Sequence, residues 1–169
     1  NATIECLAQG EKPRTSVSAA GSPTELDIER FSQFAGTIKR DGVPLASIST
    51  ATLTVSNGLE ADESIRQDGR IGGADPGPLR VGLNITTRFR DHALYDLAVS
   101  RGAVEIELGW RISATKSLVF RIHRARLPKP KFPIQGPGGV QATFAIQGAE
   151  HKTLNKTLTA ILTNDVSAY

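Results

Sequence analysis

Apolar and polar residues alternate with a period of two along much of the second half of the chain. The clearest case follows position 139, where every second residue is apolar: Val140, Ala142, Phe144 and Ile146. Side chains at alternate positions share one face of a strand, so the pattern predicts a strand with one buried and one wet face. The same pattern recurs over residues 79–89, 104–111 and 118–123.

Shorter strands are predicted elsewhere, over residues 34–38, 43–45, 50–56 and 157–163. Two dipeptides typical of tight turns lie beside them, Asp41-Gly42 and Asn57-Gly58. Glycine tolerates a positive φ that other residues avoid. We therefore place Asp41, Gly42, Asn57 and Gly58 in turns, and the total is about seven or eight strands.

Residues 91–101 are the one segment with helical spacing. Asp91 can cap the start of this helix, and Gly102 can end it. One face of the helix is apolar: Leu94, Leu97 and Ala98. Since helices do not alternate with strands, we expect a mainly β fold: an antiparallel β-sandwich or barrel of about seven or eight strands with one flanking α-helix at residues 91–101.

A stretch that resists regular structure runs directly into the strand that follows position 139. It consists of Gly136, Pro137, Gly138 and Gly139. Proline fixes its own φ, whereas glycine can adopt a positive φ. We predict that this stretch is a sharp structural turn that aims the following strand.

The composition limits the functional classes. The chain has 169 residues, enough for one domain with a real core. It has no run of about 20 apolar residues, so no membrane span is expected. The single cysteine, Cys6, excludes an internal disulfide.

Net charge is +3, from 20 basic and 17 acidic residues. Six basic residues gather in one run: Arg121, His123, Arg124, Arg126, Lys129 and Lys131. This run reads either as a nucleic-acid patch or as a solvated strand face. The second reading is favoured because no aromatic side chains for base stacking interleave with the charges.

The sequence carries no recognisable catalytic or phosphate-binding motif. The three histidines, His92, His123 and His151, lack ligand spacing, and Glu60, Asp62 and Glu63 lack the spacing of a calcium loop. Glu105 and Glu107 share one strand face, but nearby arginines favour a plain exposed surface over a pair of hydrolytic carboxylates. We therefore predict a protein that is not an enzyme and that has no catalytic residues, cofactor or metal.

Taken in order, several segments resemble the tail tube proteins (major tail proteins) of tailed bacteriophages. These segments are "TLTVSNGLEAD", "GRIGGADPG", the helix after Asp91, "GPGGVQATF" and "LTNDV". The likeness covers roughly residues 20–169. It implies a structural virion protein whose copies form stacked rings, with a channel that conducts DNA from capsid to host.

The resemblance also implies partners and a location. The partners would be further copies of the chain, other tail proteins and double-stranded DNA in passage without specific binding; no membrane is implied. The protein would belong to the virion tail and assemble in the cytoplasm of the bacterial host. The alternatives are a monomeric β-sandwich binding module or adhesin, and another tail component with the same fold. Few aromatic side chains are present for sugar stacking, which counts against a carbohydrate-binding module.

Two expectations follow for particular segments. The long loop of residues 62–78 should make assembly contacts through Arg66, Asp68, Arg70 and Asp75, because charges of both signs allow complementary pairing. The chain has no methionine, and residues 2–9 alternate like a strand. We therefore expect residues 1–22 to be an N-terminal strand and linker, the end of a preceding domain, and residues 23–169 to be a tail-tube-like β-domain.

Overall fold

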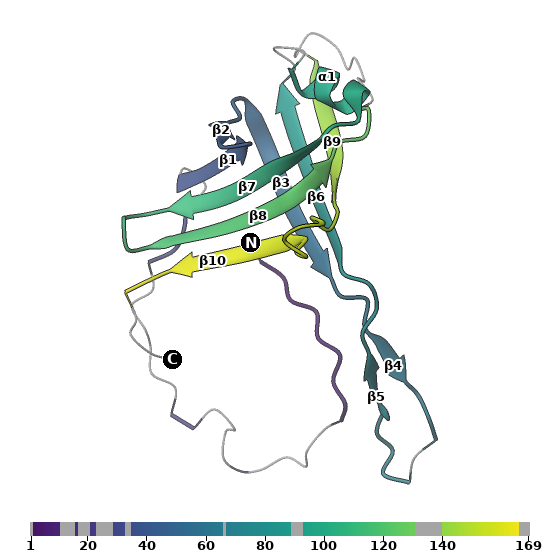
Figure 1. Ribbon diagram of the computed structural model, residues 1–169. Coiled ribbons are helices and arrows are strands. Elements are labelled where there is room, and N and C mark those ends of the chain that lie inside the picture. Colours follow the sequence, from purple (N-terminus) through teal and green to yellow (C-terminus); the bar gives the residue numbers. More distant parts are fainter. Residues whose placement is uncertain are drawn as a thin grey trace. The chain divides into compact units, whose positions relative to one another are not determined.

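Long antiparallel strands dominate the computed structural model of the protein (Figure 1). The structure describes residues 2–10, 16, 21–22, 29–32, 35–65, 67–88, 93–130 and 140–165. The chain divides into two compact units. The smaller comprises Asn1–Arg30 and Ser56–Leu79, and the larger comprises Phe31–Val55 and Arg80–Tyr169.

The larger unit holds one eight-stranded sheet. Its elements are β1 (Gly36–Arg40), β2 (Val43–Pro44), β3 (Ile48–Ser56), β6 (Arg80–Arg88), α1 (Ala93–Ser100), β7 (Ala103–Arg111), β8 (Ser117–Arg126), β9 (Gln141–Gly148) and β10 (Leu158–Thr163). The strand order is β2-β1-β7-β8-β9-β6-β3, and β10 pairs with β8 beside β9. The pairs β1–β2, β1–β7, β7–β8, β8–β9, β8–β10 and β6–β9 are all antiparallel. The predicted fold class, mainly antiparallel β with one helix, is confirmed.

The core lies between two layers of this sheet, because β7, β8 and β10 cross over β3, β6 and β9 (Figure 1). In β6, β7, β8 and β9 most of the apolar half of the alternating pattern points inward, as predicted, and the fully buried side chains include Leu83, Ile85, Ile106, Ile122, Phe144 and Ile146. On the layer of β6 and β9, Leu83 lies opposite Ile146 and Ile85 lies opposite Phe144. Each such burial contributes about 1.5–3 kcal/mol to folding.

One extra residue interrupts the pairing of β7 with β8. Val104 lies opposite Ala125 and Ile106 lies opposite Ile122, so Glu105 faces two residues of β8. This arrangement is a β-bulge, in which the bulged strand bends and twists more strongly. On either side of the bulge, Ile122 and Ala125 are both buried.

The turn between β1 and β2 is built from Asp41 and Gly42. Both have positive φ, 48° and 80°, as a type I′ hairpin turn requires. The Asp41 carboxylate also accepts a hydrogen bond from the backbone N–H of Glu105, at 2.9 Å. The same residue therefore makes the turn and ties it to β7.

The helix ends differently from the prediction. α1 ends at Ser100, and the left-handed conformation falls on Arg101 (φ 56°) and not on Gly102. Gly102 instead allows a close approach, since a Cβ there would lie 3.2 Å from the Leu97 side chain. The predicted cap, Asp91, lies outside the described residues, as do Gly136, Pro137, Gly138 and Gly139.

The smaller unit corrects two expectations. The predicted long loop contains a hairpin, in which β4 (Glu60–Asp62) pairs with β5 (Gly73–Asp75). Three-residue strands are too short to produce a readable alternation. Residues 2–10 form no strand and are exposed, although they alternate, because a strand also needs a neighbour to accept its backbone hydrogen bonds.

Candidate assembly surfaces

The outward side chains of the larger unit form two surfaces of different chemistry. On β1, β7, β8 and β10 one cross-strand row consists of Lys39, Glu107, Arg121 and Thr159. We call the outer side of these strands the charged face. On β6 and β9 the central outward pairs are Gly82 with Gln147, Asn84 with Ala145 and Thr86 with Thr143, and the pair at the end is Arg88 with Gln141. We call the three central pairs the neutral face.

Ion pairs connect the residues of the charged face. Arg121 donates from Nη2 and Nε to one oxygen of Glu107, at 2.7 and 3.0 Å. Its Nε also lies 3.6 Å from a carboxylate oxygen of Glu105. The two glutamates therefore share one guanidinium. Both carboxylates therefore have a cationic partner within the subunit.

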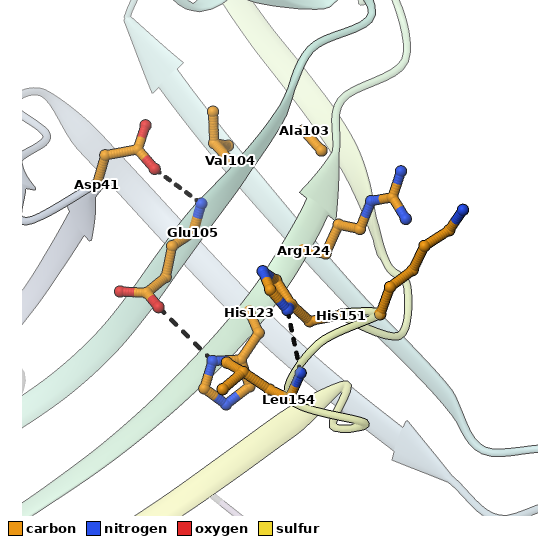
Figure 2. A pocket seen from close by; sticks show the side chains of 9 residues that line it. Asp41, Ala103, Val104, Glu105, His123, Arg124, His151 and Leu154 are labelled. Atoms are coloured by element: carbon orange, nitrogen blue, oxygen red, sulfur yellow. Dashed lines mark hydrogen bonds and ion pairs between the residues drawn. The ribbon is translucent and has the colours of Figure 1, made fainter.

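A cavity of about 540 Å³ opens at the bulge (Figure 2). His123, Arg124, His151 and Glu105 are among its lining residues. The His123 ring contacts the hydroxyl of Thr159 through Nε2 at 2.7 Å, and its Nδ1 lies 3.6 Å from Glu105. His151 accepts a hydrogen bond at Nδ1 from the backbone of Leu154, at 3.3 Å.

The fold thus brings together two histidines that the sequence separates. His123 is nearly buried, with 9% of its side chain exposed. Within the described part of the chain, however, no three His, Cys, Asp or Glu residues are grouped so that they could hold a metal ion. The ring hydrogen bonds link His123 to Thr159 and His151 to Leu154, whereas Nδ1 of His123 is buried without a hydrogen-bond partner among the described residues.

The basic run divides among three surroundings. Arg121 and His123 lie on the charged face, beside glutamates. Arg124 lines the cavity at the bulge, whereas Arg126 and Lys129 line a separate cavity near the end of α1. Lys131 lies outside the described residues. The run is therefore not one continuous patch.

The predicted assembly residues of the smaller unit are placed as follows. Asp68 accepts a hydrogen bond from the backbone N–H of Arg70, at 3.3 Å. The Arg70 side chain lies close to Gly10, since a Cβ there would be 3.0 Å from it. Asp75 is on β5, apart from this turn and opposite Glu60. Arg66 lies outside the described residues.

Two glycines close the base of the hairpin. Gly58 has a positive φ of 55°, and its carbonyl accepts a hydrogen bond from Gly77, at 3.1 Å. A Cβ on Gly77 would overlap the Gly58 carbonyl. Asn57 and Gly58 therefore do not join two adjacent paired strands, and they lead into the hairpin instead. The role of Gly77 was not predicted from the sequence, in which its position between two prolines is the signal.

Three strands of the sheet have an edge without a partner among the described residues. β2 and β3 end the strand order, and β10 pairs with β8 alone. Free edges expose backbone N–H and C=O groups that can pair with another chain. β2 has only two residues, whereas β3 and β10 are longer and largely exposed: in β10, Ile161 and Leu162 are 41% and 58% exposed. No described helix is long and apolar enough to cross a membrane.

Residues 1–148 match the family model of the phage tail tube protein. The chain belongs to this family. The predicted resemblance is therefore confirmed, and the protein is a structural component of the tail tube in a phage virion. Comparison with curated protein sequences gave no significant match.

Solved structures share the fold of this tail tube protein at low sequence identity. The tube-terminating cap of the anti-feeding prophage has a TM-score of 0.61 and 9% identity, with 86% of this chain and 100% of that chain covered. A chain of the sheath–tube complex of the PVC extracellular contractile injection system has a TM-score of 0.57 and 9% identity, with 79% of this chain and 93% of that chain covered. A chain of the native gene transfer agent virion has a TM-score of 0.53 and 12% identity, with 77% of this chain and 98% of that chain covered.

Proposed function

We propose that copies of this tail tube protein pair through their strand edges into closed rings, and that the rings stack into a tube. The free edges of β3 and β10 support this arrangement, since edge strands are ready templates for pairing between chains. A head-to-tail contact that closes on itself generates a ring. Contacts with other tail proteins would end the tube, and assembly would take place in the host cytoplasm.

We further propose that the neutral face lines the channel through which double-stranded DNA passes. The observation that carries this is the uncharged row on β6 and β9, which holds Asn84, Thr86 and Thr143. A conduit must not hold its cargo, and each phosphate that a Lys or Arg neutralises adds salt-dependent affinity. Amide and hydroxyl side chains stay hydrated without gripping the phosphates.

The position of β3 supports the same choice of wall. β3 is the neighbour of β6 and has a free edge, so pairing along it would continue the sheet of the neutral face into the next subunit. Much of β3 itself consists of exposed Thr and Ser residues. The surface that β3 adds in this way would carry no charge.

Electron microscopy of the purified chain tests the ring and tube. Rings or tubes are expected, and uniform small particles at every concentration and salt tested would contradict the proposal. The wall is tested by the double variant Asn84→Arg/Thr143→Arg. Tubes of this variant should bind double-stranded DNA, and their affinity should fall steeply as salt rises.

Wild-type tubes serve as the reference for the DNA measurement. At about 150 mM salt they should bind no tighter than the usual non-specific range of about 10⁻⁴ to 10⁻⁶ M. A matched control places the same charges on the charged face, at Val119 and Thr37, which are outward neighbours of Gly109. Sub-micromolar binding by the wild type, or equal gains from both double variants, would contradict the neutral wall.

A further inference from the structure

A second cavity in the larger unit, of about 430 Å³, lies where α1, β8 and β9 end. Its lining is Ala98, Arg101, Arg126, Leu127, Pro128, Lys129 and Gln147. We call it the cation pocket. Ala98 and Leu127 are buried, at 3% and 5% exposure, so an apolar floor supports a rim of charged and polar side chains.

The cations of this pocket are not compensated by the described part of the chain. Arg101, Arg126 and Lys129 make no side-chain hydrogen bond or ion pair with any described residue, and none of the described lining residues is acidic. Arg121 on the charged face, by contrast, has two glutamate partners. Like charges around one cavity repel one another, so the pocket favours an anionic partner.

The backbone that carries two of these cations is restricted before any partner binds. Lys129 lies between Pro128 and Pro130, whose rings fix their own φ and restrict the residue before each. Arg101 occupies the left-handed position that ends α1. A site already ordered in its binding geometry loses less entropy on association.

The smaller unit presents the opposite charge. Glu60 on β4 lies directly opposite Asp75 on β5, and both side chains are exposed. Neither makes an ion pair or a side-chain hydrogen bond within the described chain. Like charges directly opposite each other destabilise a strand pair. Among the described residues, this acidic rung therefore lacks a cation and the pocket lacks an anion.

We propose that the cation pocket of one copy receives the acidic rung, Glu60 with Asp75, of a second copy. The contact rests on the proposed tube, in which copies meet in a repeating head-to-tail order. It pairs two surfaces that each hold uncompensated charge, and it places carboxylates against the guanidinium groups of Arg101 and Arg126, with which carboxylates form strong hydrogen bonds. Charge complementarity of this kind fixes the register between partners.

The test is a charge swap in the full-length chain. Arg101→Glu/Arg126→Glu reverses the pocket, and Glu60→Lys/Asp75→Lys reverses the rung. Each double variant should raise the protein concentration needed for tube assembly by at least about tenfold, because like charges then face each other. The quadruple variant, in which both surfaces are reversed, should return to within about threefold of the wild type.

Two further samples control the swap. Lys152→Glu/Lys156→Glu changes the net charge as much as the pocket variant does, on residues that form no ion pair with the described part of the chain, and should leave assembly unchanged. An equal mixture of the two double variants should form joint assemblies, because each then meets a partner of opposite charge. Circular dichroism melting curves check that every variant is folded.

The outcomes separate the contact from the tube. Tubes that form normally from either folded double variant overturn the contact and leave the tube standing, and so does a quadruple variant no better than its parents. A pocket variant that loses only affinity for DNA would make the pocket a phosphate site and also overturn the contact. A wild type that stays monomeric overturns the proposed tube itself.

Discussion

The charged face and the neutral face belong to one sheet and enclose one core, yet they handle polarity in opposite ways. On the charged face, Glu105, Glu107 and Arg121 satisfy one another within the subunit. On the neutral face, the hydroxyls of Thr86 and Thr143 lie 3.2 Å apart and no charge is present on the central pairs. The charges of the charged face are therefore paired with one another inside the subunit, whereas the polar groups of the neutral face remain available to water.

The two faces should also differ in how much they contribute to the stability of the subunit. Ion pairs on the charged face contribute to the stability of the subunit and depend on salt. We expect the neutral face to contribute little to stability, because its central pairs carry no ion pair. The two surfaces should respond differently to substitution, and neither should respond as strongly as the core beneath them.

The largest loss of stability is expected from Phe144→Ala, because Phe144 belongs to the core that lies beneath both faces. Phe144 is 1% exposed, and truncation of a buried phenylalanine costs about 3–5 kcal/mol. Urea denaturation measures the loss. The control, Ala145→Ser on the adjacent outward position, should change stability by less than about 0.5 kcal/mol. Similar values for the two variants would mean that the strand faces are assigned wrongly.

An intermediate effect is expected on the charged face. A double-mutant cycle of Glu107→Gln and Arg121→Gln should give a coupling of about 1 kcal/mol, at the upper end for a partly exposed pair. The coupling should shrink in about 1 M salt. Lys39 also lies opposite Glu107 but makes no ion pair with it, so a cycle with Lys39→Gln should give almost none. A salt-independent coupling would argue against an electrostatic origin.

The smallest effect is expected on the neutral face. Thr86→Val/Thr143→Val removes the hydroxyl pair but keeps the β-branched shape that suits a strand. Stability should change by no more than about 0.5 kcal/mol, with no dependence on salt. Thermal melting at low and high salt measures both quantities. A loss above about 1.5 kcal/mol would show that this face is more than a hydrated surface.

The sequence predicts the fold class because inward apolar positions repeat along long strands. In β6 and β9, Leu83, Ile85, Phe144 and Ile146 carry that signal clearly. Alternation cannot reveal β4 and β5, which are three residues long. Alternation also wrongly predicts a strand over residues 2–10, because it reports a preference for the extended conformation and not the presence of a neighbouring strand.

The surfaces are less predictable than the fold. Arg121 and Arg126 are close in the sequence, but one meets two glutamates and the other lines the cation pocket. Their partners come from strands paired across the sheet, which no local pattern reports. The cross-strand meeting of Glu60 with Asp75 is set in the same way by the register of a short hairpin.

The bulge opposite Glu105 also affects how β8 tolerates changes in length. Before it the inward residues of β8 are even-numbered, as at Ile122, and after it they are odd-numbered, as at Ala125. Loss of one residue at the bulge would leave the core side chains of β8 pointing inward. Loss of a residue in the middle of β9, where pairing with β6 runs without interruption, would turn half of its core side chains into water. The loss of one residue is therefore tolerated at the bulge of β8 and not in the middle of β9.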